Sequence, residues 1–113
     1  MPVIEMRTYW TRPGMREEFL KVFVERSIPI HRDLGMPIIG PFLGVEDPDT
    51  FFFMRVFPSA AEREELKSRF YEGEPWKSEL EQRLMPLLAR WEVVLVDDTP
   101  GLTRQLLAEL AAR

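Results

Sequence analysis

The sequence of 113 residues contains no cysteine, one histidine and no cluster of lysine and arginine. The missing cysteines exclude disulfides, thiolate nucleophiles and zinc or iron–sulfur sites with cysteine ligands. One histidine, His31, is too few for a metal site built from several histidines of one chain. A net charge of −4 without a basic patch argues against nucleic acid or an anionic membrane as a partner. We therefore expect a cytoplasmic protein that uses no metal and no cofactor.

Long apolar runs are also missing. No stretch approaches the roughly 18 apolar residues of a membrane span, and the first residues lack the basic and apolar regions of a signal peptide. The hydrophobic share of 45% and the charged share of 30% are ordinary for a globular protein. The length suits one domain with a single core.

Periodicity and turn residues give an order of elements. Apolar residues at helical spacing predict a first helix that starts after Pro13-Gly14 and ends at Gly35. Pro29 is expected to kink the last turn of this helix, because proline removes a backbone hydrogen bond. Alternation and turn residues predict strands at residues 2–10, 37–46, 50–57 and 91–96.

Two further helical regions follow the third predicted strand. Ser59-Ala60-Ala61-Glu62 matches a capping box and predicts a helix over residues 59–71. After a break, a second helical piece is expected over residues 75–89. We divide the chain into one domain, residues 1–98, and a C-terminal tail helix, residues 99–113, that packs on the domain or on a partner.

The third predicted strand is apolar on both faces. One face carries only Phe52, Met54 and Val56, and the other carries three phenylalanines and Arg55. An antiparallel sheet with its helices on one side leaves the second face bare. Exposed phenylalanine rings would form a larger apolar patch than monomers tolerate. We therefore predict a homodimer whose two sheets face each other.

The same alternation assigns charged side chains to a face. We expect the purely apolar face of the third strand to meet the helices, which places Arg55 between the two sheets. Side chains on the first and fourth strands are assigned to this space by the same reasoning. Buried charges need partners, and this set allows pairing. The side chains assigned in this way are Glu5, Arg7, Tyr9 and Glu92.

Several motifs carry a family resemblance. The first strand reads Ile4-Glu5-Met6-Arg7-Thr8-Tyr9, Pro13-Gly14 precedes the first helix, and Phe57-Pro58-Ser59 precedes the second. Glu74-Pro75-Trp76 lies where the second helical region breaks. In order and spacing these motifs resemble those of the NIPSNAP family, whose first strand reads Tyr-Glu-Leu-Arg-Thr-Tyr, and the resemblance covers about residues 3–97.

The resemblance implies a fold and no particular reaction. It implies a ferredoxin-like α+β protomer, in which helices cover one face of a four-stranded antiparallel sheet, and two copies that form a dimeric α/β barrel. NIPSNAP-type proteins are mostly uncharacterised. The wider superfamily includes cofactor-free monooxygenases, haem-degrading enzymes, lactone isomerases and ligand binders, so transferring one of these activities would be an analogy of fold.

Eight residues are candidates for binding a ligand, and none is assigned a catalytic role. An arginine can hold an anionic or enolate oxygen, Glu5 can act as a base and Tyr9 can donate a proton. The alternative is an internal ion-pair network that only stabilises the dimer. Trp76 is either a wall or lid of the cavity or an ordinary packing residue. The candidates are Glu5, Arg7, Tyr9, Arg55, Glu92, Phe53, Trp76 and His31.

His31 has two interpretations. It is the one side chain whose ordinary pKa lies near neutral pH, and its place near the end of the first helix suits a surface or capping histidine. A general base or an axial haem ligand is the alternative, and both require His31 to face the pocket.

Two functions remain open at this point. The first is a homodimeric barrel that binds a small hydrophobic or aromatic molecule with an anionic or carbonyl group, with cofactor-free oxygenase or isomerase activity included. The alternative is a non-catalytic protein-interaction module whose barrel is filled by its own side chains. A cavity of about 300 Å³ or more would favour the first function, and a packed interior would favour the second.

Overall fold

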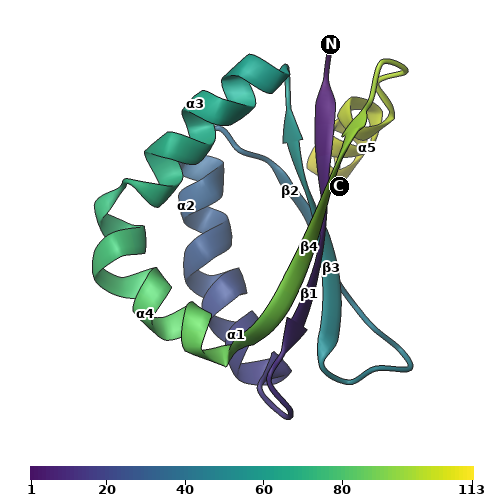
Figure 1. Ribbon diagram of the computed structural model, residues 1–113. Helices are drawn as coiled ribbons and strands as arrows, with labels where there is room; N and C mark the ends of the chain where they lie inside the picture. Colours follow the sequence, from purple (N-terminus) through teal and green to yellow (C-terminus); the bar gives the residue numbers. More distant parts are fainter.

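A computed structural model describes residues 1–113 as one antiparallel sheet with helices on both sides. The sheet has the strand order β2-β3-β1-β4. The helical layer α1 to α4 covers one face of the sheet, and α5 lies on the opposite side (Figure 1). The expected α+β fold is confirmed. The strands are β1 (Val3–Thr11), β2 (Ile38–Leu43), β3 (Thr50–Phe57) and β4 (Leu88–Asp97).

The first helical region is continuous but changes its winding. It consists of α1 (Arg16–Val22), a π-helical segment η1 (Phe23–Ser27) and α2 (Ile28–Asp33). The backbone N–H of Ile28 bonds the carbonyl of Phe23, five residues back. Pro29 follows directly and has no N–H to donate. The irregularity expected around Pro29 therefore takes the form of a π-helical turn before it. Gly35, with φ +82°, follows the helix as expected.

The second helical region begins as the capping pattern predicts. Ser59 Oγ accepts a hydrogen bond from the backbone N–H of Glu62 at 3.1 Å, and α3 (Ala60–Tyr71) follows. The helix is interrupted at Glu72 and Gly73. The chain then continues through three short segments to β4, which starts three residues earlier than expected. The three segments are the π-helical η2 (Trp76–Leu80), α4 (Glu81–Leu84) and the 3-10 turn η3 (Met85–Leu87).

The main core lies between the sheet and the helical layer. Alternate residues of β3 are buried there and their neighbours are half-buried on the other face. The buried set is Phe51, Phe53, Arg55 and Phe57. The rings of Phe51 and Phe53 pack against Phe19 and Phe23 of the first helical region, at centroid distances of 4.7–5.9 Å. The face with Arg55 therefore meets the helices.

The face assignment made from the sequence is thus wrong. The three phenylalanines bury more apolar area against the helices than the purely apolar face of β3 could. The charge of Arg55 does not prevent this, because Glu5 stands directly opposite it in the β1–β3 register. Arg55 and Glu5 are 1% and 0% exposed. The polar face of β1 points into the protomer, toward the helices.

The tail helix α5 (Leu102–Ala111) is held by Asp98. The Asp98 carboxylate accepts hydrogen bonds from the backbone N–H groups of Leu102 and Thr103 at 3.1 and 3.0 Å, and from the Thr103 hydroxyl. The leucine stripe of α5 is not buried: Leu102, Leu106 and Leu110 are all exposed. The helices of this protein are all too short or too polar to span a lipid bilayer.

Candidate functional site

A cluster of charged and phenolic side chains lies between the sheet and the helical layer. The β1–β3 register brings Glu5 opposite Arg55, and Arg7 and Tyr9 follow at two-residue spacing on the same face of β1. The helical layer completes the cluster from α2 and α3. We call this set the arginine cluster: Glu5, Arg7, Tyr9, Arg55, Arg63, Tyr71 and His31.

Glu5 is the centre of the arginine cluster. Its Oε1 accepts hydrogen bonds from Arg55 Nε at 2.5 Å and Arg7 Nη1 at 3.0 Å, and its Oε2 accepts one from Arg63 Nε at 2.6 Å. Burial raises the pKa of this carboxyl, but the hydrogen bonds and charges of the three arginines outweigh it and lower the pKa to about 2. Glu5 is therefore a charged hydrogen-bond acceptor at neutral pH. It is a poor general base, because its lone pairs are engaged.

The oxygens of the two phenols in the cluster accept hydrogen bonds from arginines, which leaves their O–H groups free to donate. Tyr9 Oη accepts from Arg7 Nε and Nη2 at 3.2 and 2.9 Å, and Tyr71 Oη accepts from Arg55 Nη1 at 3.1 Å. An arginine can only donate, so each phenolic proton is left to point elsewhere. Burial raises the pKa of Tyr9 against the charge of Arg7, which keeps this phenol protonated.

His31 faces the cluster as a neutral ring. It is 3% exposed, and its Nδ1 donates to the carbonyl of Ser27 at 2.8 Å while its Nε2 accepts from Arg55 Nη1 at 3.2 Å. Burial is the main cause that lowers its pKa to about 3, with the charges of Arg55 and Arg7 adding to it. The expectation of a surface or capping histidine is wrong. The site does not fit haem, because Nε2 is already bonded to Arg55.

The arginine cluster contains more donors than acceptors. Arg55 Nη2 is buried and has no hydrogen-bond partner. Arg63 lies at the rim and also pairs with the exposed Glu64 at 3.0 Å. Arg7 and Arg55 therefore share one buried negative charge, that of Glu5, and one positive charge remains without a partner. An unpaired buried charge is costly, so the cluster is suited to bind an anion or another oxygen acceptor.

A small cavity of about 30 Å³ adjoins the cluster. Its size allows about one water-sized occupant, far below the volume of a typical ligand site. Both π-helical segments contribute to it, Ser27 and Phe23 from η1 and Trp76 from η2. π-helical turns are often found at functional sites. The remaining walls are mostly aromatic: Tyr9, Phe19, Phe53, Phe70 and Tyr71, with His31, Arg55, Leu84 and Met85.

The structure brings seven of the eight candidate residues together. Five of them line the cavity: Tyr9, His31, Phe53, Arg55 and Trp76. Glu5 and Arg7 lie beside it through their hydrogen bonds to Arg55 and Tyr9.

The eighth candidate, Glu92, lies elsewhere. It is opposite Thr8 in the β1–β4 register, on the face turned away from the helices, and it is exposed and paired with Arg90 at 3.2 Å. The expectation that Glu92 joins the other charges is wrong, because it depended on the reversed face assignment.

Three members of the site are missed by sequence reasoning. Arg63 and Tyr71 lie on α3 and Ser27 lies in η1. In the sequence, Arg63 belongs to a run of alternating charges that resembles a solvated helix face. Tyr71 lies eight residues further, about two helical turns, so it projects from the same side of the helix as Arg63. That spacing places Arg63 and Tyr71 near each other but does not show that they face the charges of β1 and β3.

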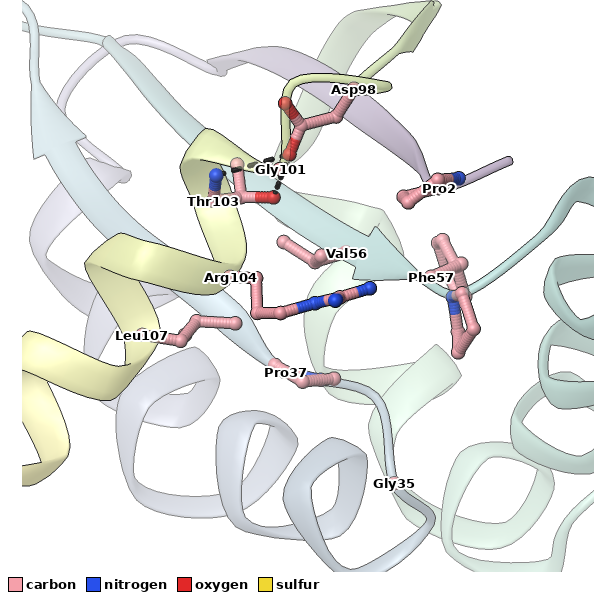
Figure 2. A pocket seen from close by; sticks show the side chains of 11 residues that line it. Pro2, Gly35, Pro37, Val56, Phe57, Asp98, Gly101, Thr103, Arg104 and Leu107 are labelled. Carbon is pink, nitrogen blue, oxygen red and sulfur yellow. Dashed lines mark hydrogen bonds between the residues drawn. The ribbon is translucent and has the colours of Figure 1, made fainter.

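A second, larger hollow lies beneath α5. It has a volume of about 220 Å³ and is lined by residues of the chain start, the end of β3 and α5. Figure 2 shows Arg104 extending from α5 between Val56 and Pro37 toward Phe57. Arg104 is exposed and Asp98 is engaged in capping α5. This hollow has no buried polar group left without a partner, so the arginine cluster is the better candidate site.

The sheet order, the helical layer and the enclosed polar cluster together define a ferredoxin-like α+β protein. The chain belongs to the NIPSNAP family, whose model matches residues 4–96. A search of curated protein sequences finds no match.

Solved structures share this fold. An uncharacterized NIPSNAP domain protein from Burkholderia xenovorans has a TM-score of 0.77 and 21% identity, over 86% of this chain and 94% of its own. A NIPSNAP family protein from Agrobacterium tumefaciens has a TM-score of 0.79 and 25% identity, over 88% of this chain and 94% of its own. A third structure is that of a protein from Chloroflexus aurantiacus, named as a proposed antibiotic biosynthesis monooxygenase. It has a TM-score of 0.63 and 17% identity, over 85% of this chain and 91% of its own. At such identities the likeness concerns the fold.

Proposed function

We propose that this protein binds a small hydrophobic or aromatic molecule through an anionic or carbonyl oxygen at the arginine cluster. The observation that carries the proposal is the buried Arg55 Nη2 without a partner, beside phenolic protons of Tyr9 and Tyr71 that have no acceptor. A ligand oxygen would satisfy these donors. The aromatic walls of the cavity suit an apolar or aromatic body.

The chemistry of the cluster suits stabilisation of an oxyanion. Arg55 and the two phenol hydroxyls resemble the donor sets that hold developing negative charge on an oxygen. A strong base is absent among them, because Glu5 is saturated by arginines and has a pKa of about 2. A cofactor-free oxygenase or isomerase reaction would therefore start from a ligand that loses its proton easily. The structural neighbour named as a proposed monooxygenase is compatible with this proposal through its fold.

Binding requires the cavity to open. Trp76 starts η2 shortly after the interruption of the helix at residues 72–73, and its ring packs on Tyr71 at a centroid distance of 5.1 Å. A shift of this segment would enlarge the cavity without breaking the sheet. We propose that Trp76 is the part of the cavity wall that moves. This is the interpretation of Trp76 as a wall or lid of the cavity.

The second candidate function is the protein-interaction module. The tight packing between the sheet and the helical layer favours it, because the remaining cavity of about 30 Å³ is far smaller than a typical ligand site. The exposed leucines of α5 offer a surface for a partner helix. In this case the arginine cluster would be an internal network.

Native mass spectrometry of freshly purified protein tests these proposals first. A retained small molecule that is lost in Arg55→Lys, while a matched Arg90→Lys variant keeps it, supports the ligand function. Lysine keeps the charge of Arg55 but replaces the three nitrogens of the guanidinium by one ammonium, so the donor at Nη2 is lost. Protein without a retained mass, and without binding to a panel of aromatic phenols and carbonyl compounds, would favour the interaction module.

We further propose that two copies pair through the outward face of the sheet. This face carries a row of apolar side chains that the helical layer does not cover, and Met6 and Val94 are exposed in it. The half-buried face of β3 and the exposed Phe42 extend the row. Such a patch suits burial against a second copy. The set comprises Met6, Thr8, Phe42, Phe52, Met54, Val94 and Val96, whereas Val56 on the same face lies beneath α5.

Met54→Asp is expected to convert the dimer into a monomer. The substitution places an unpaired charge in the middle of the proposed interface, whereas in a single copy Met54 is half-buried and hydration of the carboxylate limits the cost. Sedimentation velocity at micromolar concentration measures the effect. Val24→Asp is the matched control, because Val24 is an exposed apolar residue of the helical layer. An unchanged mass for Met54→Asp, or a wild-type monomer, would contradict the interface.

A further inference from the structure

We propose that, when no organic ligand is bound, the cavity beside Arg55 holds one halide ion such as chloride. This inference uses the same donors as the proposed function, but it names an inorganic occupant and does not require an organic molecule to bind. It follows from the charge, the free donor and the size of the site.

The charge of the buried part of the cluster is the first step. Arg7 and Arg55 are 6% and 1% exposed, and Glu5 is the buried acid that faces them. His31 adds no charge, because its Nε2 accepts from Arg55 and its Nδ1 donates to a carbonyl, as in a neutral ring. Arg63 at the rim has its own exposed partner, Glu64. The excess is therefore one positive charge, which matches one monovalent anion.

The free donor is the second step. Arg55 donates through Nε to Glu5 and through Nη1 to His31 and Tyr71. Its Nη2 has no partner although it is fully buried. The nearby phenols of Tyr9 and Tyr71 retain protons with no protein acceptor. Arg55, Tyr9 and Tyr71 all line the cavity, so an acceptor placed there lies close to these donors. A charged acceptor gives the strongest hydrogen bonds.

Size decides which anion fits. The cavity of about 30 Å³ accommodates one water-sized species. A sulfate, phosphate or organic acid exceeds it unless the wall at Trp76 moves. Water would satisfy Nη2 but would leave the charge unbalanced. The aromatic walls, which hydrate an ion poorly, favour a weakly hydrated halide over a strongly hydrated anion.

Thermal unfolding of the full chain in sodium chloride, bromide and gluconate at one ionic strength tests the inference in solution. We expect chloride and bromide to raise Tm by about 5 °C in a saturable manner relative to gluconate. In Arg7→Met the buried charge is balanced without an ion, so the halide effect should disappear. Arg90→Met removes an exposed arginine and should keep the effect. Equal Tm values in all three salts for the wild type would overturn the inference.

Bromide diffraction on wild-type crystals gives an answer that does not depend on any variant folding. An anomalous peak within hydrogen-bond distance of Arg55 Nη2 supports the inference, and peaks restricted to the protein surface overturn it. Failure of halide binding with retained binding of an organic ligand would leave the proposed function standing. Halide binding without any organic ligand would contradict the proposed function alone.

Discussion

Glu5→Gln is expected to lower the free energy of unfolding by about 3–5 kcal/mol, because it removes the one negative charge buried with Arg7 and Arg55. Glutamine has nearly the shape of glutamate, so packing changes little. The loss comes from two guanidinium groups that remain in the interior without a counter-charge. Arg63 also loses its acceptor at 2.6 Å, but it can turn toward solvent and Glu64.

Equilibrium denaturation with urea measures this change, and Glu79→Gln provides the matched control. Glu79 also binds two arginines, Arg26 and Arg83, at 2.7 and 2.8 Å, but these groups are at the surface. Exposed ion pairs contribute about 0–1 kcal/mol. Similar losses in the two variants would show that the arginine cluster is open to water, and would also remove the argument for an unbalanced charge.

Acidification from pH 8 to pH 5 is expected to reduce the free energy of unfolding by about 2 kcal/mol through His31 alone. The folded protein keeps His31 neutral, with a pKa of about 3, while the unfolded chain binds a proton near pH 6.5. Between these values the unfolded state holds more protons, so stability is full above about pH 6.5 and falls as the pH drops toward 3. His31 is the only histidine of the chain.

His31→Gln should keep the free energy of unfolding nearly constant from pH 8 to pH 5. A glutamine oxygen can still accept from Arg55 Nη1, but it does not titrate. Urea denaturation at pH 8, 6.5, 5.5 and 5 measures both proteins. Glu5 acts in a lower window: its lowered pKa of about 2 stabilises the fold above about pH 4.5, and this contribution is lost as the pH falls toward 2. A wild-type stability that stays constant from pH 8 to pH 5 would contradict the buried neutral state of His31.

Much of the architecture could be predicted from local patterns. The Ser59 cap, the turn at Gly35, the break before Trp76 and the late amphipathic helix all lie where the sequence places them. These features depend on neighbours in the chain, through hydrogen bonds of a few residues' span. The grouping of Glu5, Arg7 and Tyr9 was predictable for the same reason, since alternate residues of a strand share a face.

The sequence alone therefore determined which side chains of one strand share a face, and only the tertiary structure decided what that face meets. Alternation defines two faces of β3 but not their direction. The face that includes Arg55 turned inward because its three phenylalanines bury the larger apolar area against the helices. Glu5 on β1 makes this possible because it supplies the counter-charge of Arg55 across the strands. Arg63, Tyr71 and His31 join from helices distant in sequence, where helical spacing alone marks no charge partner. The location of the site within each protomer, between the sheet and the helices, follows from these long-range pairings.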